Sequence, residues 1–364
     1  MHRVLILGAG KIGSLISVLL SQEKEYDVHL CDHQAQCLPL INELQKTNNI
    51  HFARIDAENT HDIEAYINKQ KIGTLISALP YYCNPAIAQL ARTHNLHYFD
   101  LTEDVEVTEK VKQLSEGASS VFVPQCGLAP GFISIAAHDL ISHFDTLDTV
   151  KMRVGALPSN PNNTLKYSLT WSTDGLINEY GNPCYAIIDD ELAAVQPLEG
   201  LETITVDGLL YEAFNTSGGI GTLAETYQGK ARNMNYKTLR YPGHCEKIRF
   251  LMNELKLNDD RDTLKTILEN AVPKTMQDVV LVYVSVSGIQ HGEFYEENYV
   301  QKIYPKHISG QLWSAIQITT ASGICSVVDI ILSSPQDYHG FIKQEQFSLA
   351  QILENRIGQN YSNQ

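Results

Sequence analysis

The glycine-rich segment Gly8-Ala9-Gly10-Lys11-Ile12-Gly13 constrains the fold of this 364-residue chain more than any other feature. It directly follows the apolar run Val4–Leu7, and it opens the segment Lys11–Gln22, whose apolar residues repeat at helical spacing. The first glycine permits a tight turn, the second lets a ligand approach the backbone, and the third lets helix and strand pack closely. The pattern therefore predicts a strand, a turn and a helix whose N-terminus can bind a pyrophosphate.

Asp32 ends the next predicted strand, Val28–Cys31, and strengthens this interpretation. A carboxylate at that place can accept hydrogen bonds from ribose hydroxyls and would repel a 2′-phosphate, so NAD is favoured over NADP. The alternative is a structural glycine turn with an unrelated surface aspartate. The residues expected to bind the dinucleotide here are Gly8, Gly10, Lys11, Ile12, Gly13 and Asp32.

Strands and helices alternate through the first part of the chain. This βαβ pattern predicts an α/β fold of the Rossmann type, with a doubly wound parallel sheet. Beyond about residue 144 the pattern changes to an α+β arrangement with a mixed or antiparallel sheet, including a strand at Lys166–Thr170 and a hairpin near Gly288–Gly292. We expect a dinucleotide-binding domain at 1–143, an inserted substrate and dimerisation domain at 144–310, and helices at 311–364 that return to the first domain.

Composition narrows the classes of function. Lys and Arg number 27 against 42 Asp and Glu, a net charge of −15, which disfavours nucleic acid and anionic membranes as partners. The long apolar run Leu312–Leu332 contains several polar residues and is expected to be a buried helix instead of a membrane span. Seven scattered cysteines without a CxxC pair argue against disulfides and metal, and for a cytoplasmic location.

The carboxyl ends of the predicted strands carry further candidate residues, because ligands bind at this edge of such sheets. The expected cofactor contacts after the third, fourth and sixth strands are Asp56, Ser77, Ala78, Leu79, Pro80 and Cys126. Asp56 is alternatively a helix-start acid, and Ser77–Pro80 an ordinary strand end. Asp100 and Glu103 follow the fifth strand and are the acids expected nearest the nicotinamide. The Gly127–Gly131 stretch either holds a substrate carboxylate or is a structural turn.

Arg240 and His244 stand close together in the second part of the chain. A guanidinium suits two-point recognition of a carboxylate, and an imidazole suits proton transfer near neutral pH. The alternative is a surface arginine and a helix-capping histidine. The glycine-rich run Asn215–Gly221 either binds an anion or is a flexible turn.

Several of these stretches together resemble the saccharopine dehydrogenase family. The resemblance rests on Gly8–Gly13, Ser77–Pro80, Cys126–Gly131, Tyr167–Ser172, Gly175–Tyr180 and Thr238–His244 with Glu246–Ile248, and more weakly on Thr319–Ser322. The middle stretches look most like L-lysine 6-dehydrogenases, although Thr173-Asp174 lacks the proline of some of those enzymes. The glycine-rich run 217–221 also departs from some members of the family.

The resemblance implies a homodimer that transfers a hydride from a carbon bearing an amine to a nicotinamide, followed by hydrolysis of the imine. The substrate would be a small amino acid of the L-lysine or saccharopine type, or a carboxynorspermidine-type amine. Arg240 would bind a carboxylate, His244 would carry a proton, and Asp100 or Glu103 would hold the ammonium or orient water. The residues expected to line the substrate pocket are Tyr167, Trp171, Thr216, Gly127 and Tyr241. A catalytically silent NAD-binding sensor is the alternative from another class of function.

Overall fold

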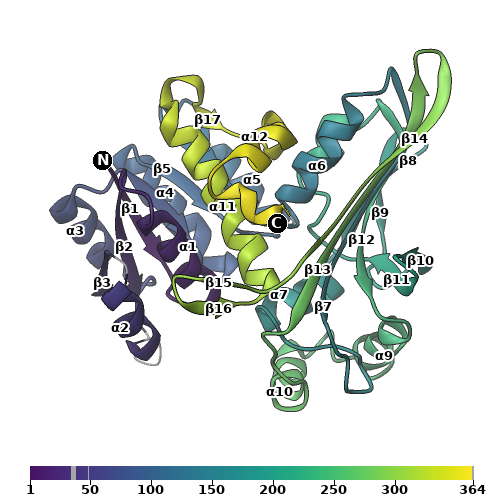
Figure 1. The fold of residues 1–364 in the computed structure, drawn as a ribbon, viewed down its shortest axis with the longest axis horizontal. Coiled ribbons are helices and arrows are strands. Elements are labelled where there is room, and N and C mark those ends of the chain that lie inside the picture. Colours follow the sequence, from purple (N-terminus) through teal and green to yellow (C-terminus); the bar gives the residue numbers. More distant parts are fainter. Residues whose placement is uncertain (34–37, 48, 363–364) are drawn as a thin grey trace. The chain divides into compact units, whose positions relative to one another are not determined.

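The computed structural model describes residues 1–33, 38–47 and 49–362, and the described chain forms two compact units (Figure 1). Compact unit 1 comprises Met1–Phe132, His307–Gln311 and Gln317–Ser362. Compact unit 2 comprises Ile133–Lys306 and Leu312–Ile316.

Compact unit 1 contains a seven-stranded sheet in the order β17-β6-β5-β4-β1-β2-β3, in which every strand pair is parallel. The predicted doubly wound parallel sheet is therefore confirmed. Its strands are β1 (His2–Leu7), β2 (Tyr26–Asp32), β3 (Ile50–Arg54), β4 (Thr74–Ser77), β5 (His97–Asp100), β6 (Val121–Val123) and β17 (Gly340–Phe341). Its helices are α1 (Lys11–Ser21), α2 (Leu38–Thr47), α3 (Thr60–Gln70), α4 (Asn84–His94), α5 (Val105–Ser115), α11 (Ala315–Ser333) and α12 (Leu349–Glu354).

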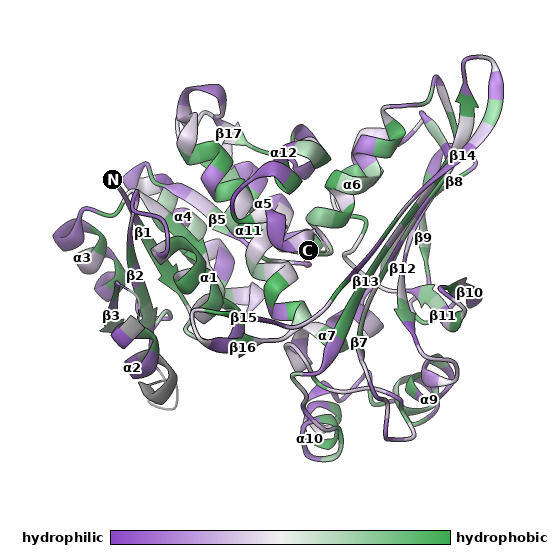
Figure 2. Cartoon of the chain, in the orientation of Figure 1, coloured by the Kyte–Doolittle hydropathy of each residue, from purple (hydrophilic) through white to green (hydrophobic). Residues whose placement is uncertain are grey.

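Burial explains why the central strands form where they do. Strand β4 and the last four residues of β1 are fully enclosed, as expected for strands covered by helices on both faces. These strands are largely hydrophobic (Figure 2). One apolar cluster joins Leu5 and Leu75 of the sheet to Ile63, Ile67 and Ile87 of the covering helices. The sequence analysis missed α5, whose apolar residues are interspersed with charged ones.

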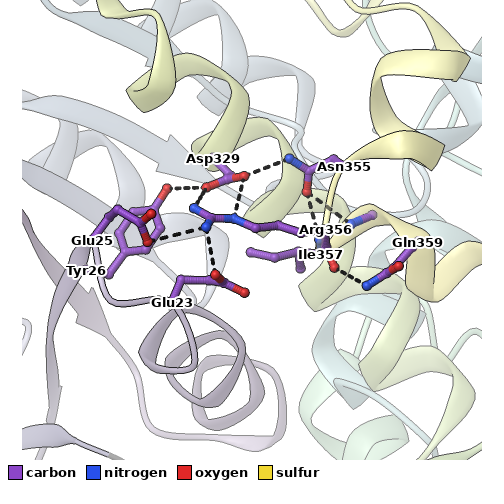
Figure 3. A network of polar contacts seen from close by, with 9 residues as sticks. Glu23, Glu25, Tyr26, Asp329, Asn355, Arg356, Ile357 and Gln359 are labelled. Atoms are coloured by element: carbon purple, nitrogen blue, oxygen red, sulfur yellow. Dashed lines mark hydrogen bonds and ion pairs between the residues drawn. The ribbon is translucent and has the colours of Figure 1, made fainter.

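Helix α11 accounts for the long apolar run near the C-terminus. By length and composition alone it could cross a membrane, but 89% of its apolar window is buried in the protein. It carries Asp329, whose carboxylate is buried and bound by Arg356 at 2.7 and 3.2 Å. Tyr26 and Asn355 also donate to this carboxylate, at 2.8 Å each (Figure 3). The network therefore ties the start of β2 to α11 and to the segment after α12.

Compact unit 2 is built on a mixed sheet in the order β10-β11-β12-β7-β13-β14, in which β8 pairs with β12 and β9 pairs with β8. The predicted hairpin is present as β13 and β14, whereas β12 pairs with β7 in parallel. The strands are β7 (Thr146–Pro158), β8 (Cys184–Ile188), β9 (Glu191–Val195), β10 (Glu202–Val206), β11 (Leu209–Asn215), β12 (Ala231–Arg240), β13 (Asp278–Gln290) and β14 (Glu293–Ile303). The helices are α6 (Phe132–Ile141), α7 (Thr173–Gly181), α8 (Leu223–Tyr227), α9 (His244–Arg249) and α10 (Arg261–Ala271), and a short two-stranded ribbon is formed by β15 (Lys306–Ile308) and β16 (Gln311–Trp313).

The strand predicted at Lys166–Thr170 is wrong. Lys166 adopts a positive φ of 51°, which interrupts an extended chain. The side chain of Asn163 bonds both the N–H and the carbonyl of Tyr167, and Leu169 donates its N–H to Pro273. The segment is therefore an irregular loop whose alternating apolar residues pack against α7, α9 and α10.

Replacing Asp329 with Ala is expected to lower the free energy of unfolding by at least about 2 kcal/mol, because it leaves the Tyr26 hydroxyl without its acceptor and removes the two hydrogen bonds that the Arg356 guanidinium donates to Asp329. Urea denaturation of the full chain measures the effect. Glu25→Gln is the matched control, since Glu25 is a more exposed partner of the same arginine, 3.3 Å away. Equal losses in the two variants would contradict the argument.

Candidate functional site

The glycine loop between β1 and α1 has the geometry of an anion cradle. Gly8 has a positive φ of 98°, and a side chain there would press on the carbonyl oxygen of Ala78 at 2.8 Å. A side chain at Gly13 would collide with the carbonyl of Gly8. Gly10, by contrast, faces open space. Two glycines therefore fix the close turn, and the third leaves room for a ligand over the start of α1.

The N-terminus of helix α1, which follows this loop, is suited to bind a negatively charged ligand. Gly10 caps α1 without any side-chain hydrogen bond, and the first turn contains no acidic residue. The N-terminus of a helix, with its backbone N–H groups and the positive end of the helix dipole, favours a phosphate there. The expected cofactor residues Lys11 and Ile12 form the first turn. The residues present therefore fit a dinucleotide pyrophosphate.

Asp32 ends β2 directly beside the loop. One carboxylate oxygen accepts the Ala9 N–H at 2.7 Å, and the other lies 3.9 Å from the ring of His33. The carboxylate is thus fixed at the edge of the cradle, where a ribose hydroxyl could donate to it. Asp56 lies beyond β3, is exposed, and accepts the N–H of Glu58, which makes it a turn residue.

The Ser77–Pro80 segment forms the wall beside the glycine loop. Ala78 donates its N–H to Leu7, and its carbonyl abuts Gly8. The buried hydroxyl of Ser77 donates to Asn84 at 2.7 Å, which ties the end of β4 to the start of α4. Ser77 therefore stabilises this wall, whose last residue, the proline, is exposed.

Asp100 is fully buried at the end of β5 and organises two loops. It accepts the N–H groups of Thr102 at 2.8 Å and Gln125 at 3.3 Å, together with the hydroxyl of Tyr98 at 2.7 Å. Burial raises the pKa of Asp100 to about 6, although these three hydrogen bonds oppose the shift. The geometry favours a positioning role for Asp100. Glu103 follows in the next loop and is only partly buried.

The Cys126–Gly131 loop closes on itself and packs on α11. Gly127 donates to Pro130 and accepts from Phe132, while a side chain at Gly131 would collide with Gly127. Gly323 of α11 approaches the Gly127 carbonyl so closely that a Cβ would lie 2.6 Å from it. Cys126 is buried, and burial raises the pKa of its thiol, so it serves as a wall residue and not as a nucleophile.

Arg240 forms the centre of the candidate site in compact unit 2. Its guanidinium is buried at the end of β12 and lies 4.9 Å from the ring centre of Tyr167 and 5.7 Å from that of Tyr180. Its Nε donates to the Tyr180 hydroxyl at 2.8 Å, and one Nη donates to the Leu239 carbonyl at 2.9 Å. The other Nη makes no hydrogen bond with the described residues. The cation thus keeps a donor for a ligand oxygen.

His244 lies in the same cluster and is fully enclosed. Its Nδ1 is 2.8 Å from the Leu165 carbonyl and its Nε2 is 3.0 Å from the Tyr180 hydroxyl. Burial, and next the charge of Arg240, lower its pKa to about 3, so the ring is neutral. Nδ1–H then donates to Leu165 and Nε2 accepts from Tyr180. These contacts favour a positioning role for His244. The role as a proton carrier, which the sequence analysis expected, stays a prediction.

The remaining expected pocket residues divide into two groups. Trp171 donates its ring N–H to the Tyr167 hydroxyl at 3.1 Å and thus joins the Arg240 cluster. Thr216 is buried, and its hydroxyl has no partner among the described residues. Tyr241, however, stacks on Tyr211 and donates to the Pro158 carbonyl, so the structure places it in another apolar cluster.

Glu179 is the residue that sequence reasoning missed. Its carboxylate raises the pKa of Arg240 together with Tyr180 and Tyr167, against the opposing effect of burial. It also raises the pKa of Tyr236, after burial. In the sequence, only its position before Tyr180, within the stretch Gly175–Tyr180 that resembles the family, could have indicated a role for it. Glu179 thus adds negative electrostatic potential at the guanidinium of Arg240.

Gly10→Ala and Gly13→Ala separate ligand binding from folding at the glycine loop. The methyl added at position 10 would project into open space where a pyrophosphate is expected, so we expect unchanged thermal stability and at least tenfold weaker NAD or NADP binding. Gly13→Ala forces α1 away from β1 and should lower the melting temperature as well. Calorimetric titration and thermal unfolding measure the two effects. Unaltered binding by Gly10→Ala would contradict the assignment.

Asp100→Asn removes the titration of a buried acid but keeps an oxygen for the Thr102 and Gln125 amides. Because folding raises this pKa to about 6 from an unfolded value of about 3.9, the stability it contributes is present below about pH 4 and is lost as the pH rises through 6. We expect the wild type to lose roughly 3 kcal/mol more than the Asn variant between about pH 4 and pH 7, measured in urea. Asp100→Ala is the control that is less stable at every pH. Parallel profiles for wild type and Asn variant would refute this.

Two family models cover most of the chain. Residues 4–121 match the saccharopine dehydrogenase NADP binding domain, and residues 127–358 match the saccharopine dehydrogenase C-terminal domain. Mitochondrial alpha-aminoadipic semialdehyde synthase of Rattus norvegicus is 20% identical over 298 residues, which are 78% of this chain and 31% of the relative. The chain thus spans less than a third of that protein. Carboxynorspermidine synthase of Vibrio cholerae is 22% identical over 179 residues, or 42% of this chain and 43% of the relative.

A solved structure supports the fold. Saccharopine dehydrogenase (L-Glu forming) of Saccharomyces cerevisiae aligns with a TM-score of 0.76 and 14% identity, covering 99% of this chain and 96% of that one. The parallel-sheet unit and the mixed-sheet unit found here thus share the fold of that structure. The chain belongs to the saccharopine dehydrogenase family.

Proposed function

We propose that this protein oxidises a C–N bond of an amino acid, with a substrate of the saccharopine type and L-lysine as the alternative. The observation that carries the proposal is Arg240, a buried cation with one donor nitrogen still available. A buried charge needs a partner of opposite sign, and a planar guanidinium matches a carboxylate. The names of the matched family models and of the similar solved structure support saccharopine, and the matched synthase of Vibrio cholerae supports carboxynorspermidine-type amines as a further candidate.

The Arg240 cluster is suited to a zwitterion. Arg240 would hold the α-carboxylate, and Glu179, which interacts electrostatically with Arg240, would accept from the α-ammonium. Tyr180 and the neutral His244 fix the guanidinium through a directed chain of hydrogen bonds. The rings of Tyr167 and Tyr180 exclude water from the cation, which strengthens its attraction for a carboxylate.

The glycine loop would bind the cofactor that takes part in this reaction. When bound, the nicotinamide supplies the hydride acceptor. The N–H groups at the start of α1 would hold the pyrophosphate, and Asp32 would accept from the ribose, which favours NAD, although the matching family model is named for NADP. After hydride loss, water adds to the substrate iminium carbon and the C–N bond breaks, giving an amine and a carbonyl product. Glu103 stays a prediction for the group that orients this water.

We further propose that the protein is a homodimer, is located in the cytoplasm and has no nucleic-acid or membrane partners. It is supported by the resemblance and by the acidic composition.

A substrate panel tests the proposal. Saccharopine, L-lysine and carboxynorspermidine are offered to the full chain with NAD or NADP, and reduction is followed by nicotinamide absorbance. We expect turnover with saccharopine and NAD, and the preferred amine then identifies the substrate type. Cofactor binding without turnover of any amine would favour the sensor alternative.

Arg240→Lys is expected to raise KM for the amino acid at least tenfold with a smaller change in kcat, because lysine cannot reproduce the flat, multi-donor fork. Initial-rate kinetics measure both constants. Arg249→Lys is the matched control, because Arg249 lies in the adjacent helix α9 and is half-exposed in an ion pair with Glu199. Equal KM and kcat values in the two variants would contradict the assignment of Arg240 to the substrate site.

A further inference from the structure

A cavity lies in compact unit 1 near the start of strands β1, β2 and β3. It has a volume of about 660 Å³ and is lined by side chains of these strands, of the end of α3 and of Gln45 in α2. The glycine loop follows the opposite end of β1, and Arg3 and Gly8 are separated by roughly 16 Å of extended chain. Neither the cofactor nor the substrate assignments use this cavity.

The strand register brings four polar side chains together there. Arg3 of β1 pairs with Asp27 of β2, and His29 of β2 pairs with His51 of β3. Because alternate residues of a strand share a face, Asp27 and His29 point to the same side. The rings of His29 and His51 lie 4.9 Å apart, and Asp27 lies 3.1 Å from the Nε2 of His51 and 3.3 Å from the Nε of Arg3.

His29 is the central residue of the cavity. It is only 4% exposed, and its Nδ1 is 2.9 Å from the Tyr66 hydroxyl. Burial raises the pKa of Tyr66 to about 12, so this hydroxyl keeps its proton and donates it to Nδ1. The opposite nitrogen, Nε2, then carries a hydrogen but has no hydrogen-bond partner among the described residues, since Asp27 lies 3.7 Å away. A buried donor of this kind is unfavourable unless an acceptor enters the cavity.

The charges around His29 define the kind of acceptor. Among the described residues of the lining, Asp27 is the single acid, and Arg3 and His51 already face it. Lys69 and Lys71 also line the cavity, are exposed, and form no ion pair with the described residues. The lining is therefore cationic, in contrast with the net charge of −15 of the whole chain. A neutral ligand would leave these two lysines unmatched, whereas an anion would be attracted by both.

We propose that this cavity binds a small oxyanion, a phosphate or carboxylate group, whose oxygen accepts from His29 and whose charge faces Lys69 and Lys71. The mouth of the cavity, lined by the end of α3, allows the rest of a metabolite to project outwards. The site is distinct from the dinucleotide loop and does not depend on which amine the protein oxidises.

Calorimetric titration of the full chain with inorganic phosphate, and separately with malonate, at constant ionic strength tests the proposal. We expect saturable binding of at least one probe, and the tighter probe distinguishes a phosphate ester from a carboxylate source. The double substitution of Lys69→Met and Lys71→Met should weaken binding at least tenfold. His29→Asn should also weaken binding, in a protein of unchanged melting temperature. If the His29 variant unfolds, Tyr66→Phe takes its place and should weaken binding instead.

The matched control is Lys110→Met with Lys274→Met, two exposed lysines elsewhere in the chain, which should bind the probe within twofold of wild type. Absence of saturable binding, equal weakening in both double variants, or displacement of the probe by NAD would each overturn the assignment. Displacement by NAD would place the anion in the glycine loop, and Gly10→Ala tests binding at that loop independently.

Discussion

Helix α1 can start directly after strand β1 only because position 13 has no side chain. The carbonyl of Gly8 occupies the space that a Cβ of residue 13 would need, and the carbonyl of Ala78 lies against Gly8 in turn. This close packing directs the first N–H groups of α1 to the end of β1, beside Asp32. The shape of the glycine loop, the position of Asp32 and the wall after β4 thus all follow from one steric constraint.

In compact unit 2 the corresponding constraint is the burial of a charge. A guanidinium enclosed at the end of β12 needs several stabilising contacts, and the protein provides two aromatic faces, one hydroxyl, one carbonyl and a nearby carboxylate. The charge in turn disfavours protonation of His244, which therefore acts as an acceptor. The same residues that stabilise the cation also orient it, so stability and the proposed recognition of a carboxylate would have a common origin.

Local patterns were sufficient to predict the glycine loop, which is a local motif, and the parallel sheet, because alternating strands and helices favour parallel pairing even of distant strands such as β1 and β4. The strand at Lys166–Thr170 failed because a single residue with positive φ and contacts to Pro273 override its alternating apolar pattern. Arg240 and His244 were correctly placed together, but the enclosed state of His244 depends on Leu165 and Tyr180, which are distant in sequence. The role of Tyr241 could not be predicted either, since adjacent residues of a strand face opposite sides and only the register shows which side is the site.

The two ends of the parallel sheet differ chemically, and this difference explains how each could meet an anion. At the carboxyl ends of the strands helices begin, so backbone N–H groups are available to a phosphate without any charged side chain. At the amino ends helices terminate and present carbonyls, as at Gln70, whose carbonyl is capped by Arg3. An anion at this end must therefore be bound by side chains, and the arginine, lysines and imidazoles around Asp27 are what such a site requires. The helix C-terminus favours these cations, so the unsatisfied feature of the cluster is the buried Nε2 of His29, which a ligand oxygen would satisfy.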